Sequence, residues 1–206
     1  MHHTLFIPVI ALGLTAWTAP AGSHLALPDA AGAFEAGRHE LQIGAGVFIS
    51  VQNTSRKRPQ IDDADGLLRY GWMLTTPAGD GFWRGNTELL VSAFGAGIYK
   101  GPGSVLAGGT LLLRQNFVQP HARWVPYLQI EAGCLYSDGY RDATQGALGN
   151  GFEFALGGGV GLRCLWDERW AAFAEADYRH ISNAGLGDRN LGTNAVGGVV
   201  GVSWLF

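Results

Sequence analysis

The sequence predicts an all-β fold, an eight-stranded antiparallel transmembrane β-barrel of the bacterial outer membrane. Three observations lead to this prediction. Apolar residues alternate with polar or small ones over most of the chain, aromatic residues stand at both ends of the apolar faces, and the last apolar stripe ends in Phe206. Alternation with a period of two indicates strands with two different faces.

The alternation is clearest in the first predicted strand. Its apolar set is Leu41, Ile43, Ala45, Val47, Ile49 and Val51, and the residues between them are polar or small, with Phe48 as the exception. We expect eight strands, at residues 38–52, 66–75, 82–99, 108–117, 124–136, 151–165, 170–182 and 193–206. Their polar faces include Arg69, Glu88, Arg114, Glu131, Glu153, Arg163, Glu175, Asp177 and Arg179.

Alternation alone does not say which face is inside, and the aromatic residues help to decide. Trp124 and Tyr136 share the apolar face of one predicted strand and stand at its two ends, as Phe152 and Trp166 do in the next. Twelve residues at about 3.3 Å each, tilted by about 40°, span roughly 30 Å, which matches the apolar thickness of a bilayer. Aromatic residues at both edges of an apolar band are typical of membrane barrels, so we expect the polar face inside.

Loop lengths and the C-terminus point the same way. The connections at 118–123 and 165–169 are short, and those at 52–65, 137–150 and 183–192 are longer, as expected for periplasmic turns and outer loops. Val196, Val200, Val202, Trp204 and Phe206 form one apolar stripe. A terminal aromatic of this kind resembles the last-strand signature of bacterial outer-membrane proteins.

The N-terminus predicts export. Residues 5–17 are uncharged and mostly apolar but too short for a transmembrane helix, which needs about 20 residues, and Ala19-Pro20-Ala21 fits a signal-peptidase site. We therefore expect a signal peptide at 1–21, an N-terminal periplasmic segment at 22–37 and the barrel at 38–206. Charged residues make up 15% of the chain, against about 25% in soluble domains, and the net charge of −3 argues against nucleic acid as a partner.

The two cysteines and a glycine-rich run are given structural interpretations. Cys134 and Cys164 lie at opposite ends of neighbouring antiparallel strands, on the order of 30 Å apart, so we expect free thiols. Gly157-Gly158-Gly159-Val160-Gly161 resembles a nucleotide-binding loop, but it lies within a predicted strand and no helix follows. Glycines there are expected to relieve crowding inside a narrow barrel.

One polar pair stands where lipid is expected. His180 and Ser182 share the face of Ala172, Ala174, Ala176 and Tyr178, at the outer end of the seventh predicted strand. A spacing of two places both side chains on one face, where histidine can take the serine proton and the alkoxide can attack an ester. The alternative is an interfacial polar pair without chemistry.

The residues around this pair resemble a known family. His180-Ile181-Ser182-Asn183-Ala184-Gly185, followed by Asn190-x-Gly192, is similar to the signature of the PagL family of lipid A 3-O-deacylases. The resemblance implies an eight-stranded outer-membrane barrel that hydrolyses the 3-O-linked 3-hydroxyacyl ester of lipid A. It also implies Ser182 as the nucleophile and His180 as the general base. Asn183 sits where the family's oxyanion-stabilising asparagine is proposed, and either Asn183 or a nearby backbone N–H is expected to hold the oxyanion. This scheme requires no metal, and we expect no cofactor.

The chain departs from the family at one position. Fourteen residues after the histidine the best-known members carry an acidic residue, and this chain has Asn194, on the same face as His180. Asparagine can orient a histidine through its carbonyl oxygen but supplies no charge. Three interpretations stay open here: Asn194 is a working third member, the site is impaired, or Asp188 substitutes from the loop.

Two further expectations concern partners. Arg56-Lys57-Arg58 in the first outer loop either binds lipid A phosphates or forms a solvated loop, and a homodimer is left open. The competing hypothesis for the whole chain is a non-catalytic outer-membrane barrel with a structural or adhesive role. An outward-facing His180, Ser182 and Asn194 would favour the enzyme, because a plain barrel has no reason to place these groups in lipid.

Overall fold

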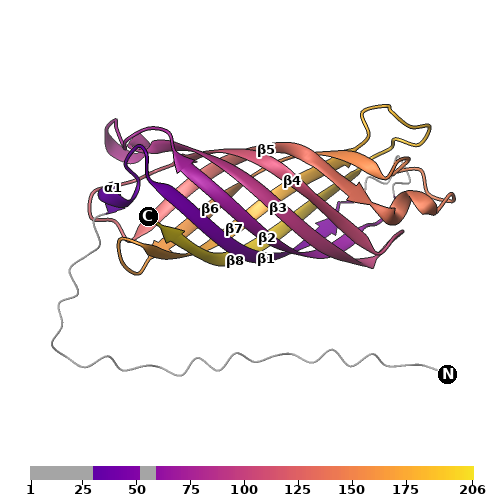
Figure 1. Ribbon diagram of the computed structural model, residues 1–206, viewed down its shortest axis with the longest axis horizontal. Coiled ribbons are helices and arrows are strands. Elements are labelled where there is room, and N and C mark those ends of the chain that lie inside the picture. The colour runs from indigo at the N-terminus through magenta and orange to yellow at the C-terminus, as the bar shows by residue number, and fades with distance from the viewer. Residues whose placement is uncertain (1–29, 52–58) are drawn as a thin grey trace, which may run out of the picture.

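The computed structural model describes residues 30–51 and 59–206, and it shows a closed antiparallel β-barrel (Figure 1). The predicted signal peptide at 1–21 and part of the predicted segment at 22–37 lie outside the described residues. Every strand pairs with two neighbours, and β1 pairs with β8 to close the sheet. The strands are β1 (His39–Ser50), β2 (Asp62–Met73), β3 (Asn86–Lys100), β4 (Val105–Asn116), β5 (Trp124–Ser137), β6 (Phe152–Leu165), β7 (Trp170–Ser182) and β8 (Thr193–Leu205). The predicted eight-stranded fold is confirmed.

The two ends of the barrel differ. One end, here called the turn end, carries the short connections at 117–123 and 166–169 together with the C-terminus and the short helix α1 (Ala30–Ala33) (Figure 1). The opposite loop end carries the connections at 138–151 and 183–192, which include the 3-10 helix η2 (Asp138–Arg141). Among the described residues no helix is long and apolar enough to cross a membrane.

The outer wall is apolar and the lumen is polar. Outward side chains such as Ile43, Leu111 and Ile130 are more than half exposed, whereas the charged residues of the alternate set are buried. Closing the sheet satisfies the backbone N–H and C=O groups that lipid cannot satisfy. Phe48, the exception to the alternation, points inward and packs in the lumen with Leu67, Phe173, Ala195 and Val199.

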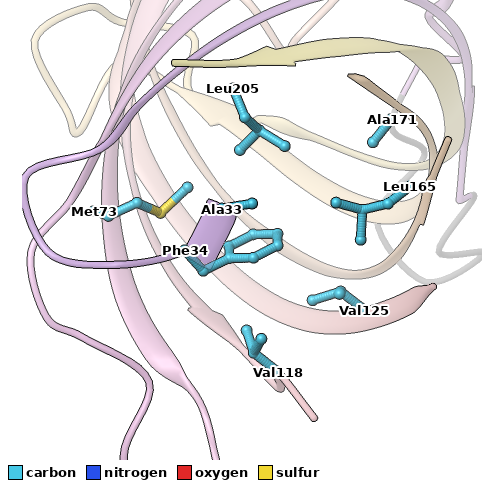
Figure 2. Packing of buried hydrophobic residues seen from close by; sticks show 8 residues of the cluster. All are labelled: Ala33, Phe34, Met73, Val118, Val125, Leu165, Ala171 and Leu205. Atoms are coloured by element: carbon cyan, nitrogen blue, oxygen red, sulfur yellow. The ribbon is translucent and has the colours of Figure 1, made fainter. Parts of the chain in front are cut away.

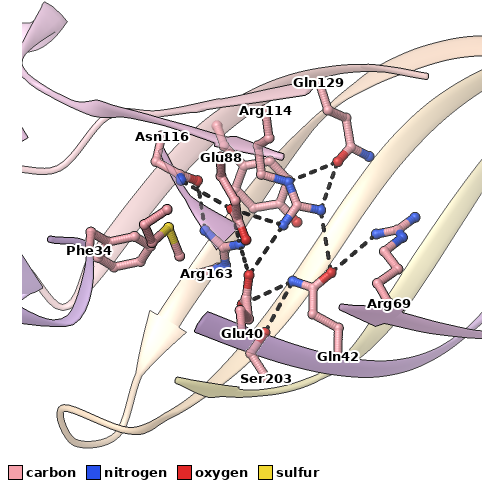
Figure 3. A network of polar contacts seen from close by, with 12 residues as sticks. Phe34, Glu40, Gln42, Arg69, Glu88, Arg114, Asn116, Gln129, Arg163 and Ser203 are labelled. Carbon is pink, nitrogen blue, oxygen red and sulfur yellow. Dashed lines mark hydrogen bonds and ion pairs between the residues drawn. The ribbon is translucent and has the colours of Figure 1, made fainter. Parts of the chain in front are cut away.

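Arg163 holds one half of the lumen network, near the turn end (Figure 3). Its guanidinium donates to the carboxylates of Glu40 and Glu88, the latter at 3.0 Å, and to Oδ1 of Asn116 at 2.7 Å. The side chains of Arg163 and both glutamates are completely buried. A buried charge is tolerable only when it is paired and hydrogen-bonded, so the four residues depend on one another.

Glu175 organises the next layer of the lumen. It accepts from Arg69 at 2.8 Å, from Arg114 at 3.1 Å and from the hydroxyl of Tyr127 at 2.7 Å. Inward-facing Gly161 leaves room for Tyr127, because a Cβ at that position would overlap the Tyr127 ring. Glycine in this part of β6 therefore relieves crowding, as expected, and the narrow lumen is filled by side chains.

Three strand boundaries predicted from the sequence are wrong. β2 begins at Asp62 rather than residue 66, because Asp63 and Asp65 face the lumen and pair with Arg179, at 2.5 and 3.6 Å. β3 begins at Asn86 rather than residue 82, because residues 81–83 form the 3-10 helix η1 (Gly81–Trp83), which starts in a left-handed glycine. β4 begins at Val105 rather than residue 108. Consequently the 74–85 connection at the turn end is longer than the 101–104 connection at the loop end.

The N-terminal segment closes the turn end (Figure 2). Phe34 is fully buried, and the carbonyl oxygen of Phe34 accepts from Nδ2 of Asn86 at 2.8 Å. Around it lies a cluster of apolar residues from five strands and their turns, namely Met73, Val118, Val125, Leu165, Ala171 and Leu205. This part of the segment that was expected to be periplasmic is packed into the barrel end.

The cysteines confirm the predicted register of β5 and β6. Cys134 pairs with Phe154, and Cys164 pairs with Trp124, ten residues away along the same pair of strands. Both cysteines are free.

Arg163→Met tests the lumen network. Removing the guanidinium leaves the buried Glu40 and Glu88 with only the more distant Arg114, at 3.6 Å from each, so we expect the free energy of unfolding to fall by about 3 kcal/mol. Urea unfolding of the barrel in detergent micelles, followed by heat-modifiable gel migration, measures this change. Arg169→Met, at an exposed arginine of the 166–169 turn, is the matched control and should leave stability nearly unchanged. Equal midpoints for the two variants would contradict the proposed dependence.

Candidate active site

The end of β7 nearest the loop end of the barrel carries the predicted catalytic pair on the outer wall. The side chains of His180 and Ser182 are both partly exposed. Arg179, which precedes the pair, and Ile181, which lies between its two members, are buried in the barrel. On one side β6 places Leu156 opposite His180 and Phe154 opposite Ser182. On the other side β8 places Asn194 directly opposite His180.

The three side chains form one chain of hydrogen bonds. Nε2 of His180 lies 3.1 Å from Oγ of Ser182, and Nδ1 of His180 lies 2.6 Å from Oδ1 of Asn194. A carbonyl oxygen only accepts, so this contact keeps the His180 proton on Nδ1. The lone pair of Nε2 then faces the Ser182 hydroxyl, which is the arrangement that a general base requires.

Tyr178 joins this chain, and the sequence analysis did not single it out. Its hydroxyl donates to Oδ1 of Asn194 at 3.0 Å. Tyr178 shares the outward face of His180, and a diagonal neighbour across an antiparallel pair is within reach of a long aromatic side chain. The contact could be found only with the β7–β8 register, which the sequence does not supply.

Asn183 is buried and hydrogen-bonded within the 183–192 loop. It is completely buried, its Nδ2 donates to the carbonyl of Arg189 at 2.9 Å, and its Oδ1 accepts from the backbone of Gly185 at 3.0 Å. The backbone N–H of Asn183 donates to Oδ1 of Asn190 at 2.9 Å. The side-chain amide and the backbone N–H of Asn183 therefore both donate within the 183–192 loop. These contacts do not support Asn183 as a direct oxyanion donor.

The neighbouring turn leaves one backbone donor free. Gly185 and Leu186 donate their N–H groups to Asn183, whereas the N–H of Ala184 has no acceptor within residues 30–51 and 59–206. Ala184 adopts a left-handed φ of 53°, a conformation that costs energy for a residue with a Cβ. The 183–192 loop therefore holds this N–H in an unusual orientation two residues after Ser182.

The 183–192 loop is fixed to the 138–151 loop. The guanidinium of Arg189 donates to the carbonyls of Tyr140 and Asp142, both at 2.6 Å, and of Gln145 at 3.0 Å. The other end of η2 is held by Asp138, whose pKa is lowered by hydrogen bonds from the backbone of Ser104 at 2.7 Å and of Val105 at 3.0 Å. Hydrogen bonds consequently connect the 183–192 loop, the 138–151 loop and the start of β4.

The remaining predicted residues lie apart from the catalytic pair or outside the described chain. Nδ1 of His180 is hydrogen-bonded to Asn194, whereas Asp188 is an exposed loop residue. Arg56, Lys57 and Arg58 lie outside the described residues. Within the described part of the chain no cluster of His, Cys, Asp or Glu has the arrangement of a metal site.

An apolar hollow on the outer wall begins at Ser182. Strands β5 and β6 form its floor and sides, and Ser182 and Ala184 stand at its edge. Small residues of β5 lie opposite bulky ones of β6, and the lining is Ala132, Gly133, Cys134, Phe152, Phe154 and Leu156. The Ser182 hydroxyl therefore adjoins a surface that suits a hydrocarbon chain.

Comparison with known proteins decides the family. The model of the lipid A 3-O-deacylase (PagL) family matches residues 65–203, which include His180, Ser182 and Asn194. The chain belongs to the PagL family. It is a lipid A deacylase, a hydrolase that acts on an ester bond, and it resides in the bacterial outer membrane. The hypothesis of a non-catalytic barrel is set aside.

Solved structures agree on the fold. The outer membrane enzyme PagL matches with a TM-score of 0.56 and 17% identity, over 78% of this chain and 97% of that one. Neisserial surface protein A matches with a TM-score of 0.50 and 14% identity, over 82% and 97%. A comparison with curated protein sequences found no match. In an outer-membrane barrel the long loops lie outside, so the loop end of this PagL-family protein faces the cell exterior.

Gly192→Ala tests how closely the loop fits the catalytic pair. Gly192 has a φ of 63°, and a Cβ there would lie 2.8 Å from the carbonyl oxygen of Ile181 and 3.1 Å from Cε1 of His180. The pair must shift, and small displacements of reacting groups can cost up to about 10²-fold, so we expect deacylation to fall at least about tenfold. Gly37→Ala, with a φ of 85° and open space around it, imposes similar backbone strain far from the site and is the control. Equal activities of the two variants, measured on purified lipid A, would contradict this account.

Proposed function

We propose that this protein hydrolyses the 3-O-linked 3-hydroxyacyl ester of lipid A with Ser182 as nucleophile, His180 as general base and Asn194 as the residue that orients the base. The observation that carries the proposal is the unbroken hydrogen-bond chain from Ser182 through His180 to Asn194 on the lipid-facing wall. Polar side chains are costly in contact with lipid, so three that face lipid and point at one another favour a functional site.

In the first half of the reaction His180 takes the Ser182 proton on Nε2 while Oγ attacks the ester carbonyl. The tetrahedral intermediate collapses, and the imidazolium returns the proton to the sugar oxygen that leaves. In the second half His180 activates water, which attacks the acyl-serine ester and releases the 3-hydroxy fatty acid. Asn194 keeps the ring in the required tautomer throughout, through its contact with Nδ1.

We assign the oxyanion to the free N–H of Ala184 rather than to Asn183. Ala184 follows Ser182 by two residues and lines the same apolar hollow, and a single oxyanion donor is typically worth roughly 3 kcal/mol in the barrier. Asn183 then acts one step away, because its buried amide holds the turn that presents this N–H.

The outer wall supplies the remaining substrate contacts in this proposal. The acyl chain would lie in the apolar hollow over β5 and β6, with its ester at Ser182. Arg56, Lys57 and Arg58 stay candidates for the lipid A phosphates. A homodimer also stays a prediction, and the mechanism does not require one, since all the proposed reacting groups come from one chain.

Ser182→Ala and His180→Ala test the assignment directly. Without the nucleophile, or without proton transfer, we expect deacylation to fall by at least about 10³-fold while the barrel still shows heat-modifiable migration. Mass spectrometry of lipid A, from cells that express each variant and from the purified proteins, measures the loss of the 3-hydroxyacyl group. His39→Ala, at a histidine of the turn end, is the matched control and should keep wild-type activity. Release of 3-hydroxy fatty acid at the wild-type rate by folded Ser182→Ala would refute the mechanism.

Asn194 variants test the third residue. Asn194→Ala should lower the rate about tenfold, less than His180→Ala, because it affects orientation and not the proton transfer itself. Asn194→Asp should raise the rate, since a carboxylate both orients the ring and stabilises the imidazolium that forms. Initial rates of the purified variants on lipid A measure both effects. Unchanged rates in both variants would remove Asn194 from the mechanism.

A further inference from the structure

Resting on the proposed function, we propose that Tyr178 is a positioning residue that fixes which end of the Asn194 amide faces His180. The geometry behind the proposal is the shared acceptor: Oδ1 of Asn194 receives both the Tyr178 hydroxyl, at 3.0 Å, and Nδ1 of His180, at 2.6 Å. The three residues occupy adjacent outward positions of the β7–β8 pair, where His180 lies opposite Asn194 and Tyr178 lies opposite Val196.

An asparagine at the third position creates a problem that a carboxylate does not have. A carboxylate presents an acceptor on either side, whereas an amide presents an oxygen or an NH₂ group, and the two orientations are similar in shape. If Nδ2 faced His180, the ring would accept at Nδ1 and carry its proton on Nε2. That proton would point at Ser182, and His180 could not serve as the base.

The Tyr178 hydroxyl favours the productive orientation. Its hydrogen needs an acceptor, and Oδ1 of Asn194 is the one that it has among the described residues. Turning the amide over would withdraw this acceptor at a surface where lipid offers no replacement. Tyr178 is 44% exposed on the outer wall and lies opposite the exposed Val196, so its surroundings on this surface are apolar.

The proposal assigns Tyr178 an indirect role, because none of its contacts reaches Ser182. Loss of the hydroxyl should leave the barrel and the apolar hollow unchanged and increase the share of His180 that carries its proton on Nε2. The expected kinetic signature is a lower kcat with an unchanged KM, since the fraction of competent sites falls while lipid binding does not change.

The test combines Tyr178→Phe with Asn194→Asp in a double-mutant cycle. In the Asn194 protein Tyr178→Phe should lower kcat about fivefold, the size expected for losing one hydrogen bond, with KM unchanged. In the Asn194→Asp protein the same change should lower kcat by less than about twofold, because either carboxylate oxygen can face His180. Tyr99→Phe removes a hydroxyl from another exposed, outward tyrosine of β3 and should have no effect in either background.

A second measurement is independent of activity. Nitrogen-15 NMR of histidine-labelled protein in micelles reports the tautomer of His180, with His180→Ala identifying its signals. We expect the proton on Nδ1 in the wild type and a mixture of tautomers in Tyr178→Phe. A wild-type kcat in Tyr178→Phe, an equal loss in both backgrounds, or an unchanged tautomer would each overturn the proposal. Wild-type activity in Ser182→Ala would instead overturn the proposed function, and the tautomer measurement would still report on Tyr178.

Discussion

Satisfying the backbone inside a bilayer is the constraint on which the rest of this structure depends. Lipid offers no hydrogen bonds, so a sheet that crosses it must close on itself. With eight strands the closed sheet encloses a lumen that side chains can fill. Here Arg163 with Glu40 and Glu88, and Glu175 with Arg69 and Arg114, fill it with buried ion pairs. In the described part of the barrel these side chains leave no lumen cavity large enough for a lipid substrate, and we therefore propose that the chemistry on lipid A takes place on the outer wall.

Strand register positions the residues of the proposed site, a role that loops have in many soluble enzymes. His180 and Ser182 share a face because they are two apart on β7, and Asn194 meets His180 because β8 pairs residue with residue. The ion pairs of the lumen and the cluster around Phe34 stabilise the barrel that sets this register. The 183–192 loop adds a turn that is held by the buried Asn183, and within the described residues the N–H of Ala184, two residues after Ser182, has no acceptor.

The sequence predicted the barrel well because the two-residue alternation extends through all eight strands and is a property of local residue pairs. It also placed His180, Ser182 and Asn194 on one face, since parity along a strand needs no tertiary information. The predicted start of β2 was wrong because acidic residues face inward there. Asp63 and Asp65 are typical of a loop in the sequence, and their pairing with Arg179, far away in the chain, is evident only in the structure. The hydrogen bond between Tyr178 and Asn194 and the hydrogen bonds of Asn183 within its loop could not be predicted from the sequence either. Both depend on which residues lie opposite each other across strands or loops.

The central claim is that the hydrogen-bond chain on the lipid-facing wall makes Ser182 a nucleophile. Labelling with a long-chain alkyl fluorophosphonate, which phosphonylates only activated serines, tests this most directly when the adduct is located by peptide mass spectrometry. The account predicts one adduct, on Ser182, and a loss of labelling in folded His180→Ala protein. An adduct only at another serine, or labelling of Ser182 at the same rate without His180, would contradict it.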